Sequence, residues 1–446
     1  MTVSPARTIV ACGLALLVTH LAAMVLLAKP TGRVIFGDAT HHFVQLRSVV
    51  YDGDLHFTND YAHIYDVENE LPGLEWIFTD LTETGYVRNY MPVGPAILWA
   101  PLYLLLSGVL AIGSYLGLTS APDGFDWLLQ LVPGVMGIAA STMAAWLAWR
   151  MARRVADDTS ALVGVIGVWL GSHALYYALV SPSYSHAPSM LTGAAFFSTW
   201  AATRERPSVS VLAAWGALAG ACALMRWQDA VFMIVPLIEA ARWRAPAGHR
   251  LAAALAAGGA FLLVFSPQMI VWHVLYGQPF AIPQGPSFMQ WTSPHPIAVL
   301  FSDNHGLFSW APILALAVFG LLGLRVVPSA WRLPLVAVLL ISWYVNAAVA
   351  DWWAGEAFGA RRFLSLFVLF SVGLAAWIAR APALSRPWTA RLSTVAVFVV
   401  LNGLLLLQYQ VFMKGLRDVA PYPGGANLWL DRFVVPFRLI ARWWNG

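Results

Sequence analysis

Charged residues are scarce in this chain, and the acidic ones are unevenly placed. Only 11% of its 446 residues are charged and 59% are hydrophobic, whereas a soluble domain carries about 25% charged residues. This balance excludes an ordinary soluble domain and is typical of a polytopic membrane protein. Ten of the 22 acidic residues nevertheless fall within one stretch: Asp38, Asp52, Asp54, Asp60, Asp66, Glu68, Glu70, Glu75, Asp80 and Glu83. We therefore expect that stretch to lie in water and most of the remaining chain to lie in lipid.

Lysine and cysteine are almost absent as well. Lys29 and Lys414 are the only lysines, so the formal net charge of +4 comes from arginine. No basic run interleaved with aromatic residues is present, which argues against a nucleic-acid partner. Cys12 and Cys222 stand alone in hydrophobic segments and are interpreted as buried apolar thiols. The sequence contains no Asn-x-Ser/Thr triplet, which is compatible with a bacterial source.

Long hydrophobic runs, by contrast, recur along the whole chain. Spanning a bilayer takes about 20 apolar residues, and the run from Ile9 to Ala28 provides 20 before Lys29 and Pro30. This run exceeds the roughly 7–15 apolar residues of a signal peptide and predicts an uncleaved first membrane helix. Further candidates lie near 93–117, 127–149, 159–180, 189–203, 209–225, 230–241, 250–275, 307–324, 333–350, 363–379 and 392–411. We predict an all-α fold, a polytopic bundle of about 11–13 transmembrane helices that forms a single integral membrane domain over residues 1–446.

Arginines divide the connecting loops into two groups. Cytoplasmic loops are enriched in arginine, and five loops carry that mark, at 150–154, 204–206, 242–250, 325–332 and 380–391. The first loop (29–91), a second loop (276–306) and the segment 351–363 then face the outside. Two full crossings between Pro92 and Arg150 would put Arg150 on the outside. We therefore expect "MPVGPAILWAP" (91–101) to enter the membrane without crossing it; an outside N-terminus is the alternative.

The C-terminal segment 412–446 is predicted to lie along the bilayer surface. Phe433, Phe437, Ile440 and Trp444 recur at helical spacing, with arginines elsewhere on the helical wheel. An amphipathic helix of this kind buries its apolar face in the membrane interface. No internal repeat and no low-complexity linker divides the chain into separate domains.

The first loop opens with an unusual helical face. Asp38, His41, His42 and Gln45 stand at positions i, i+3, i+4 and i+7, which share one side of a helix. Residues 38–51 therefore predict an amphipathic helix with a polar stripe. Asp38 either caps that helix or acts as a general base, because the helix dipole keeps a carboxylate ionised at this end.

A metal site in the first loop is a weaker alternative. Asp38, His41, His42, His56, His63 and Asp66 are ligand types that a divalent metal accepts. The zinc-protease pattern HExxH is missing, and the spacing fits no closed zinc motif. We expect no metal and no other cofactor.

Several motifs of the first loop together resemble a known family. A short N-terminal helix, "GD" opening a second helix, a "DGDL" turn and "YMPVGPAILWAP" are similar to the GT-C glycosyltransferases. These are polytopic enzymes that take a sugar from a polyprenyl-phosphate carrier, and they include protein O-mannosyltransferases and the aminoarabinose transferases of lipid A. The resemblance implies a GT-C-like fold, with Asp38 as the catalytic acidic residue of the first loop, which acts as a base or orients the acceptor. Tyr90 and Pro92 match the residues that open the next helix in that family.

The match departs from the family at one position. Many relatives carry a second acid directly after the first, whereas this chain has Ala39. Asp52 and Asp54 are therefore kept as alternative bases, with a turn-forming role as the simpler interpretation. Asp54 is also kept as a candidate contact for substrate.

Three other segments on the same side carry candidate substrate-binding residues. "DWWAGEAFGARRF" (351–363) has two adjacent arginines on the outer side, although arginine is usually enriched in cytoplasmic loops. An arginine pair can bind the phosphate of a lipid. "RWQD" (226–229) offers either an internal salt bridge or contacts to phosphate and sugar. "SPSYSHAPS" (181–189) is either a lining element or an ordinary polar loop. With the first loop, the candidate substrate-binding residues are His41, His42, Asp54, Tyr90, Tyr184, His186, Arg226, Asp229, Asp351, Glu356, Arg361 and Arg362.

The resemblance, together with these residues, implies an inverting glycosyltransferase. Asp38 would accept the proton of an acceptor hydroxyl, and Arg361 and Arg362 would hold the departing lipid phosphate. The expected partners are a polyprenyl-phosphate-linked sugar, a glycan, lipid or protein acceptor, and membrane lipids. The expected location is the bacterial cytoplasmic membrane, with the active site facing the periplasm or the outside. A polytopic transporter or lipid-carrier flippase is the alternative.

Overall fold

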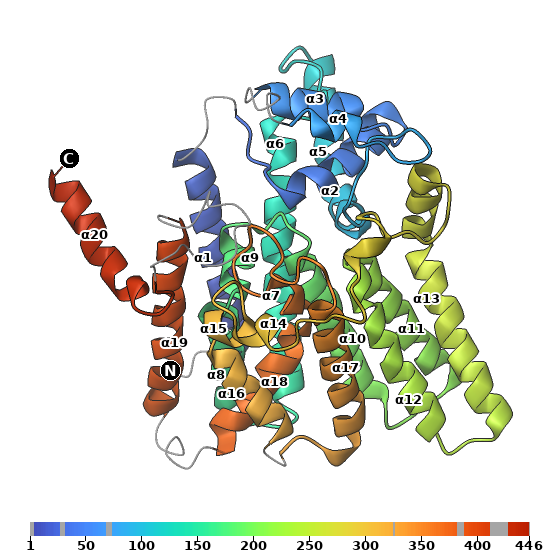
Figure 1. Cartoon of the computed structure of the whole chain (residues 1–446), viewed down its shortest axis with the longest axis vertical. Helices are drawn as coiled ribbons and strands as arrows, with labels where there is room; N and C mark the ends of the chain where they lie inside the picture. Colours follow the sequence, from blue (N-terminus) through green and yellow to red (C-terminus); the bar gives the residue numbers. More distant parts are fainter. Residues whose placement is uncertain are drawn as a thin grey trace.

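The computed structural model describes residues 4–26, 32–67, 74–323, 326–380, 388–410 and 427–445. Within these ranges the chain is helical and has no β-strand, only the isolated bridges Leu81–Val87 and Met289–Val349 (Figure 1). The prediction of an all-α fold is confirmed for this part of the chain. Residues 27–31 and 68–73 of the first loop, and 411–426 and 446 of the C-terminal segment, lie outside it.

Six described segments are long and apolar enough to cross a membrane. They are α1 (Pro5–Leu26), α5 (Gly94–Tyr115), α6 with α7 (Trp127–Gln130 and Val132–Ala152), α13 (Ala247–Tyr276), α17 (Ser329–Ala347), and the 3₁₀ helix η4 with α18 (Arg361–Leu366 and Phe367–Arg380). Four shorter apolar helices accompany them: α8 (Asp158–Gly171), α11 (Val209–Met225), α16 (Ile313–Leu322) and part of α19 (Trp388–Gln408). The chain therefore has the helices of a membrane protein, while the count of 11–13 spanning helices stays a prediction.

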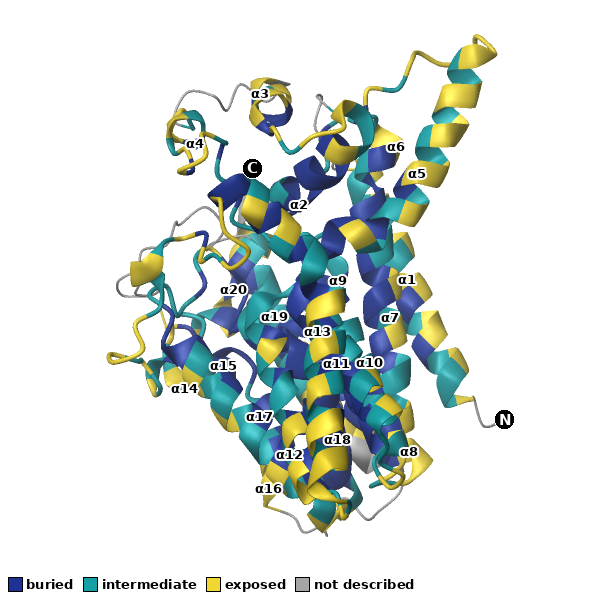
Figure 2. Cartoon of the chain, turned by 90° about the vertical axis from the view of Figure 1, so that its right-hand side faces the viewer, coloured by how far each residue is buried: buried dark blue, intermediate teal, exposed yellow. Residues whose placement is uncertain are grey.

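The centre of the bundle is formed by α7, α8, α10 (His186–Thr203) and α18. Small residues let neighbouring helices of the bundle approach closely. A Cβ on Gly320 of α16 would lie 2.0 Å from the Gly373 carbonyl oxygen of α18. Gly216 of α11 is equally close to the Ala257 carbonyl of α13. Such contacts are the usual way in which helices pack where lipid removes the hydrophobic driving force. Peripheral α1 and α13 instead expose apolar side chains (Figure 2).

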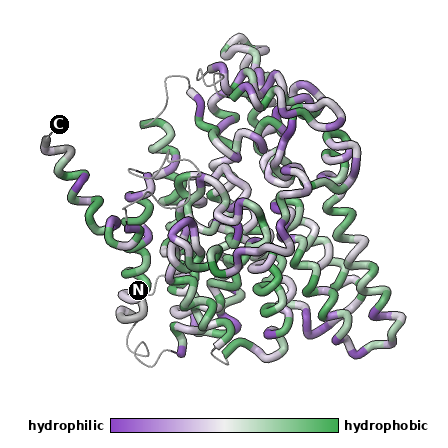
Figure 3. Tube along the Cα trace, in the orientation of Figure 1, coloured by the Kyte–Doolittle hydropathy of each residue, from purple (hydrophilic) through white to green (hydrophobic). Residues whose placement is uncertain are grey.

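The acid-rich first loop folds into a cap over one end of the bundle. We call residues 32–67 and 74–90 the cap; it holds α2 (Asp38–Arg47), the π-helical turn η1 (Ser48–Asp52), α3 (Thr58–Val67) and α4 (Trp76–Thr79). Hydrophilic residues gather in it, as Figure 3 shows. A separate apolar cluster that includes Phe43, Phe57 and Trp99 attaches the cap to α5 and α13. The cap is therefore packed as a small core of its own.

The helix α5 stays on the cap side of the molecule. It begins against the end of α11, where a Cβ on Gly94 would meet the Leu224 carbonyl at 2.2 Å. From there it projects beyond α2 instead of running back along α7 (Figure 2). The chain thus reaches α7 without returning to the arginine-bearing end. The expectation that 91–101 enters the membrane without crossing it stays a prediction, because α5 is itself long and apolar enough to span a bilayer.

The C-terminal helix α20 (Asp431–Asn445) has the predicted amphipathic pattern. Phe433, Phe437, Ile440 and Trp444 are exposed, whereas Arg432 and Val435 are buried. The helix packs against α19 and diverges from the bundle (Figure 1). Its position on a bilayer surface stays a prediction.

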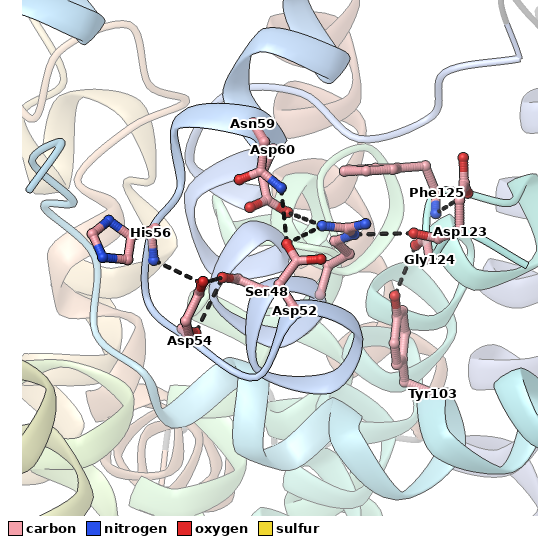
Figure 4. A network of polar contacts seen from close by, with 11 residues as sticks. Ser48, Asp52, Asp54, His56, Asn59, Asp60, Tyr103, Asp123, Gly124 and Phe125 are labelled. Carbon is pink, nitrogen blue, oxygen red and sulfur yellow. Dashed lines mark hydrogen bonds and ion pairs between the residues drawn. The ribbon is translucent and has the colours of Figure 1, made fainter.

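A polar network around Arg47 fastens the parts of the cap together (Figure 4). The guanidinium donates to the Asp52 carboxylate, to Asp60 Oδ1 at 3.3 Å and to the Asp123 carbonyl at 3.0 Å. The guanidinium carbon of Arg47 also lies 4.6 Å from the centre of the Phe125 ring. Burial raises the pKa of Asp60 to about 7, and the nearby charge of Asp52 adds to the rise while Arg47 opposes it.

This raised pKa makes the stability of the cap depend on pH. The folded state holds a proton on Asp60 up to about pH 7, whereas the unfolded chain releases it near pH 4. The stabilising effect is therefore complete below pH 4 and is lost as pH rises through 7, with a magnitude of about 4 kcal/mol at most. We expect the unfolding temperature of the wild type to fall between pH 5 and 8, and that of Asp60→Asn to fall much less.

The control is Asp54→Asn, an exposed carboxylate of the same cap. It should keep the pH dependence of the wild type. Identical pH dependence in the wild type and in Asp60→Asn, measured by thermal unfolding of the purified protein, contradicts this assignment.

Candidate functional site

Asp38 lies at the first turn of α2 and does not cap it. The residue at the cap position is Gly37, which makes no side-chain capping bond. Gly37 also has a φ of 57°, a conformation that favours glycine. The capping interpretation of Asp38 is wrong, because its carboxylate is turned toward another part of the chain.

The partner of Asp38 is Arg361, which lies 323 residues further along the chain. Arg361 Nη1 donates to Asp38 Oδ2 at 2.5 Å, and the two side chains are 14% and 22% exposed. Burial raises the pKa of Asp38, but Arg361 and its cationic neighbours more than offset this, so the pKa lies below its ordinary value. The site therefore contains an ionised carboxylate at neutral pH.

Tyr184 lies directly beside this carboxylate. A Cβ built on Gly37 would stand 2.1 Å from Tyr184 Oη, so the phenol fills the space that any larger residue would need. Tyr177 packs behind it, with its ring centre 6.1 Å from that of Tyr184, and its hydroxyl accepts the Phe358 N–H at 3.1 Å. Sequence reasoning missed Tyr177. Its one available signal was a tyrosine inside an apolar segment, where a hydroxyl needs a partner.

Arg226 and Asp229 do not form the salt bridge that was one interpretation of "RWQD". Arg226 Nη1 donates to Ser185 Oγ at 3.0 Å and to His186 Nδ1 at 3.1 Å. Asp229 instead accepts the Ser365 hydroxyl at 2.7 Å. The break between α11 and α12 (Ile234–Arg242), occupied by the 3₁₀ helix η2 (Trp227–Met233), turns the two side chains toward different neighbours. Arg226 is thereby left close to Asp38 and Arg361, whose charges it feels.

Two buried histidines complete the site, and their rings carry the proton on different nitrogens. His42 Nδ1 lies 2.9 Å from the Pro92 carbonyl, so it carries the proton and leaves Nε2 as an acceptor. His186 Nδ1 accepts from Arg226, so its proton is on Nε2, which is a donor. Both Nε2 atoms are buried and lack a hydrogen-bond partner within the described residues. Burial lowers the pKa of His42 to about 4, so its ring is neutral at neutral pH.

The segment 351–363 holds its two arginines in different roles. Arg362 donates to Asp351 Oδ1 at 2.6 Å and to its carbonyl at 2.7 Å, so its guanidinium is committed within the segment. Only Arg361 turns toward Asp38. The prediction that both arginines bind one phosphate stays a prediction, and Arg362 is paired with Asp351 here. Glu356 is exposed, and its charge acts on Tyr176 and Tyr409.

Backbone strain marks the same segment. Ala354 has a φ of 67°, and Gly355 and Gly359 have φ values of 64° and 66°. His305, with a φ of 62°, places Nδ1 2.8 Å from the Trp353 carbonyl. Non-glycine residues in this conformation are costly and persist where the surroundings impose them. The loop 302–306 therefore supports the turn that presents Arg361.

The remaining candidates lie outside this cluster. Asp54 accepts from Ser48 Oγ and from the His56 N–H, which is the turn-forming role, and Asp52 pairs with Arg47. The turn-forming interpretation of Asp54 is confirmed, while a role for either residue as the base stays a prediction. Tyr90 donates to the Asp80 carboxylate.

His41 connects the cluster to that neighbouring region. Its Nδ1 lies 2.7 Å from Tyr61 Oη, and its ring borders a small pocket with Tyr90, Trp76 and Arg88. Burial lowers the pKa of His41, while the charge of Asp38 opposes the shift.

The described residues contain no group of three or more His, Cys, Asp or Glu side chains placed to hold a metal ion. His56 stacks on Tyr86 and His63 stacks on Phe125, with ring centres 4.3 and 4.1 Å apart. The second loop, 276–306, is tied to the end of α17 by bonds such as that from the Gln290 N–H to the Ala348 carbonyl, at 2.6 Å.

The contact between Gly37 and Tyr184 can be tested by Gly37→Ala. A positive φ costs an L-residue roughly 1–2 kcal/mol, and here the methyl group also displaces the phenol. Gly53→Ala is the matched control, because Gly53 has a φ of 75° and nothing within 4 Å of a Cβ. We expect both variants to unfold at a lower temperature than the wild type, and Gly37→Ala at the lower temperature of the two. Equal shifts would show that Tyr184 does not press on this site.

No family model matches this chain, and no curated protein sequence matches it. What the site does is therefore inferred from its own residues, their distances and their charges.

Proposed function

We propose that this chain is a membrane glycosyltransferase of the GT-C type that moves a sugar, with inversion, from a polyprenyl-phosphate carrier to an acceptor hydroxyl. The observation that carries the proposal is the contact between Asp38 and Arg361 at one end of an apolar helix bundle. It brings a base and a phosphate-binding group to one place from opposite ends of the chain. Arg226, His42 and His186 surround the pair with further groups suited to phosphate and hydroxyl.

Asp38 is assigned as the general base. Its ionised carboxylate accepts the proton as the acceptor oxygen attacks the anomeric carbon, and the bond from that carbon to the phosphate oxygen breaks. The ion pair occupies one nitrogen of Arg361, so the other donors of its fork are available to the departing phosphate. Stabilising that charge in a partly buried site is expected to supply much of the rate.

Arg226 is assigned to the same phosphate. With Arg361 it places two guanidiniums around the one carboxylate of Asp38, which leaves a positive charge for an anionic ligand. Arg362 is assigned a positioning role, because its contacts to Asp351 hold the segment that ends in Arg361.

The two histidines favour a sugar over a simple anion. The Nε2 of His42 accepts and the Nε2 of His186 donates, and a hydroxyl is the group that offers both complements. An unpaired buried donor or acceptor costs about 1–3 kcal/mol, so a ligand hydroxyl that reaches either atom removes this cost. The acceptor is a glycan, a lipid or a protein.

The site is assigned to the outer face of a bacterial cytoplasmic membrane. The arginine-bearing loops lie at the end of the bundle opposite the cap (Figure 1), and such loops remain in the cytoplasm. A lipid-linked donor then reaches the site within the membrane, and no nucleotide is needed.

Asp38→Asn tests the assignment of the base. A general base contributes about 10²–10⁴-fold to the rate, so we expect Asp38→Asn to lose activity by about that factor. The variant should still bind the lipid phosphate. The measurement is release of free polyprenyl phosphate from a panel of polyprenyl-phosphate-linked sugars, followed by mass spectrometry. Asp54→Asn, on the same cap but away from Arg361, should keep full activity. Undiminished release by Asp38→Asn removes the base from this role, and lipid movement without release supports a flippase.

Arg226→Gln tests the phosphate site separately from the base. A charge-assisted hydrogen bond contributes about 1.5–3 kcal/mol, so polyprenyl phosphate should bind roughly 10–150-fold more weakly. The control is Arg88→Gln, which removes a guanidinium paired with Asp80 in the cap. If Arg226→Gln binds the lipid phosphate as tightly as the wild type does, Arg226 has only a structural role.

A further inference from the structure

A basic recess lies at the far end of α7, away from Asp38. It is formed where the end of α7 meets the start of α8 and the end of α10, and it has a volume of about 530 Å³. The 21 residues of α7 span about 30 Å at 1.5 Å each, which is the thickness of the hydrocarbon core. The recess therefore opens at the opposite membrane surface from the cap.

Three arginines set the charge of this recess. Arg150, Arg153 and Arg154 line it, and the one acidic lining residue is Asp158. Arg153 pairs with Asp158, so the charges of Arg150 and Arg154 are not balanced by a lining carboxylate. Hydroxyl groups of Ser198 and Thr199 belong to the same lining.

Tryptophan rings hold two of the guanidiniums in place. Arg150 lies 4.8 Å above the ring of Trp146, and Arg153 lies 4.9 Å above the ring of Trp149. Stacking of this kind orients a guanidinium while its N–H groups remain available to an anion. Tryptophan at this depth is also typical of the membrane interface.

An apolar groove meets the recess at Trp146. The groove runs between α1 and α7, has a volume of about 450 Å³ and is lined by residues such as Val10, Leu14 and Met143. These three side chains are 48–56% exposed. Trp146 lines the groove, and its ring lies under the guanidinium of Arg150, which lines the recess. One ligand with a charged head and a long apolar tail therefore fits both.

We propose that the recess and the groove together bind one anionic phospholipid from the leaflet on the arginine-bearing side. Its phosphate lies between Arg150 and Arg154, and an acyl chain follows the groove along α1. Basic pockets between membrane helices on the cytoplasmic side bind such headgroups. The groove selects a lipid over free phosphate, and the unbalanced charge selects an anionic over a zwitterionic lipid. The site is independent of the proposed transfer reaction.

The bound lipid holds α1 against α7. Gly13 of α1 allows contact with Thr142 of α7, where a Cβ would lie 2.3 Å from the threonine hydroxyl. Elsewhere α1 is largely exposed, and it leads toward α2 and Asp38. A lipid in the groove covers part of that exposed face.

Native mass spectrometry and thermal unfolding of the full-length protein in detergent test this proposal without any measure of activity. The probes are phosphatidylglycerol, phosphatidylcholine and inorganic phosphate. We expect phosphatidylglycerol to remain bound and to raise the unfolding temperature, and the other two to do neither. The double variant Arg150→Gln/Arg154→Gln should bind phosphatidylglycerol at least 10-fold more weakly.

The matched control is Arg206→Gln/Arg244→Gln, which removes two exposed arginines from the same end of the bundle. It should bind the lipid as the wild type does. Ala139→Phe places a ring in the groove, where Ala139 is exposed, and should weaken lipid binding with all three recess arginines intact.

Each of three outcomes overturns the proposal. Equal retention of phosphatidylcholine removes the charge selection, and equal stabilisation by inorganic phosphate reduces the recess to a simple anion site. Unchanged binding by both Arg150→Gln/Arg154→Gln and Ala139→Phe places the lipid elsewhere. A fourth probe, polyprenyl phosphate, overturns it if it displaces phosphatidylglycerol from the wild type, because the groove then belongs to the sugar donor.

Discussion

The contact between Asp38 and Arg361 is the constraint on which the site depends. Placing two ions in a partly buried position costs several kcal/mol, and attraction offsets this cost only when geometry and further bonds are favourable. Here Asp38 begins a helix of the cap and Arg361 begins the helix that is most buried in the bundle. The pair therefore fixes the cap over the bundle. It also leaves the carboxylate and the guanidinium side by side, where a ligand can bind one of them or both.

The two histidines beside this pair are neutral, and the structure determines which nitrogen of each carries the proton. The Pro92 carbonyl determines the tautomer of His42, and Arg226 determines that of His186. The result is one acceptor and one donor beside an ionic centre. Charged groups suit a phosphate and neutral ones suit hydroxyls, so the arrangement matches a ligand that carries both. Gly37 keeps Tyr184 close by having no side chain.

The molecule also has two chemically different ends, and α7 separates them. The cap end gathers carboxylates, histidines and the paired arginine. The other end has three arginines and one lining carboxylate, with Arg150 over a tryptophan ring next to an apolar groove. Because the length of α7 matches the hydrocarbon thickness, each end meets a different membrane surface. We propose a lipid-borne substrate for one end and a resident lipid for the other.

Local pattern in the sequence was enough to predict some of these features and not others. The helical fold, the membrane character and the shared face of Asp38 and His42 follow from hydrophobic runs and from the spacing of helical residues, which act over a few turns. Only the tertiary structure decided that Arg361 meets Asp38 while the adjacent Arg362 turns to Asp351, and that Arg226 and Asp229 part. These outcomes depend on how helices distant in sequence pack, and on the strained backbone that turns each side chain. No local spacing carries that information.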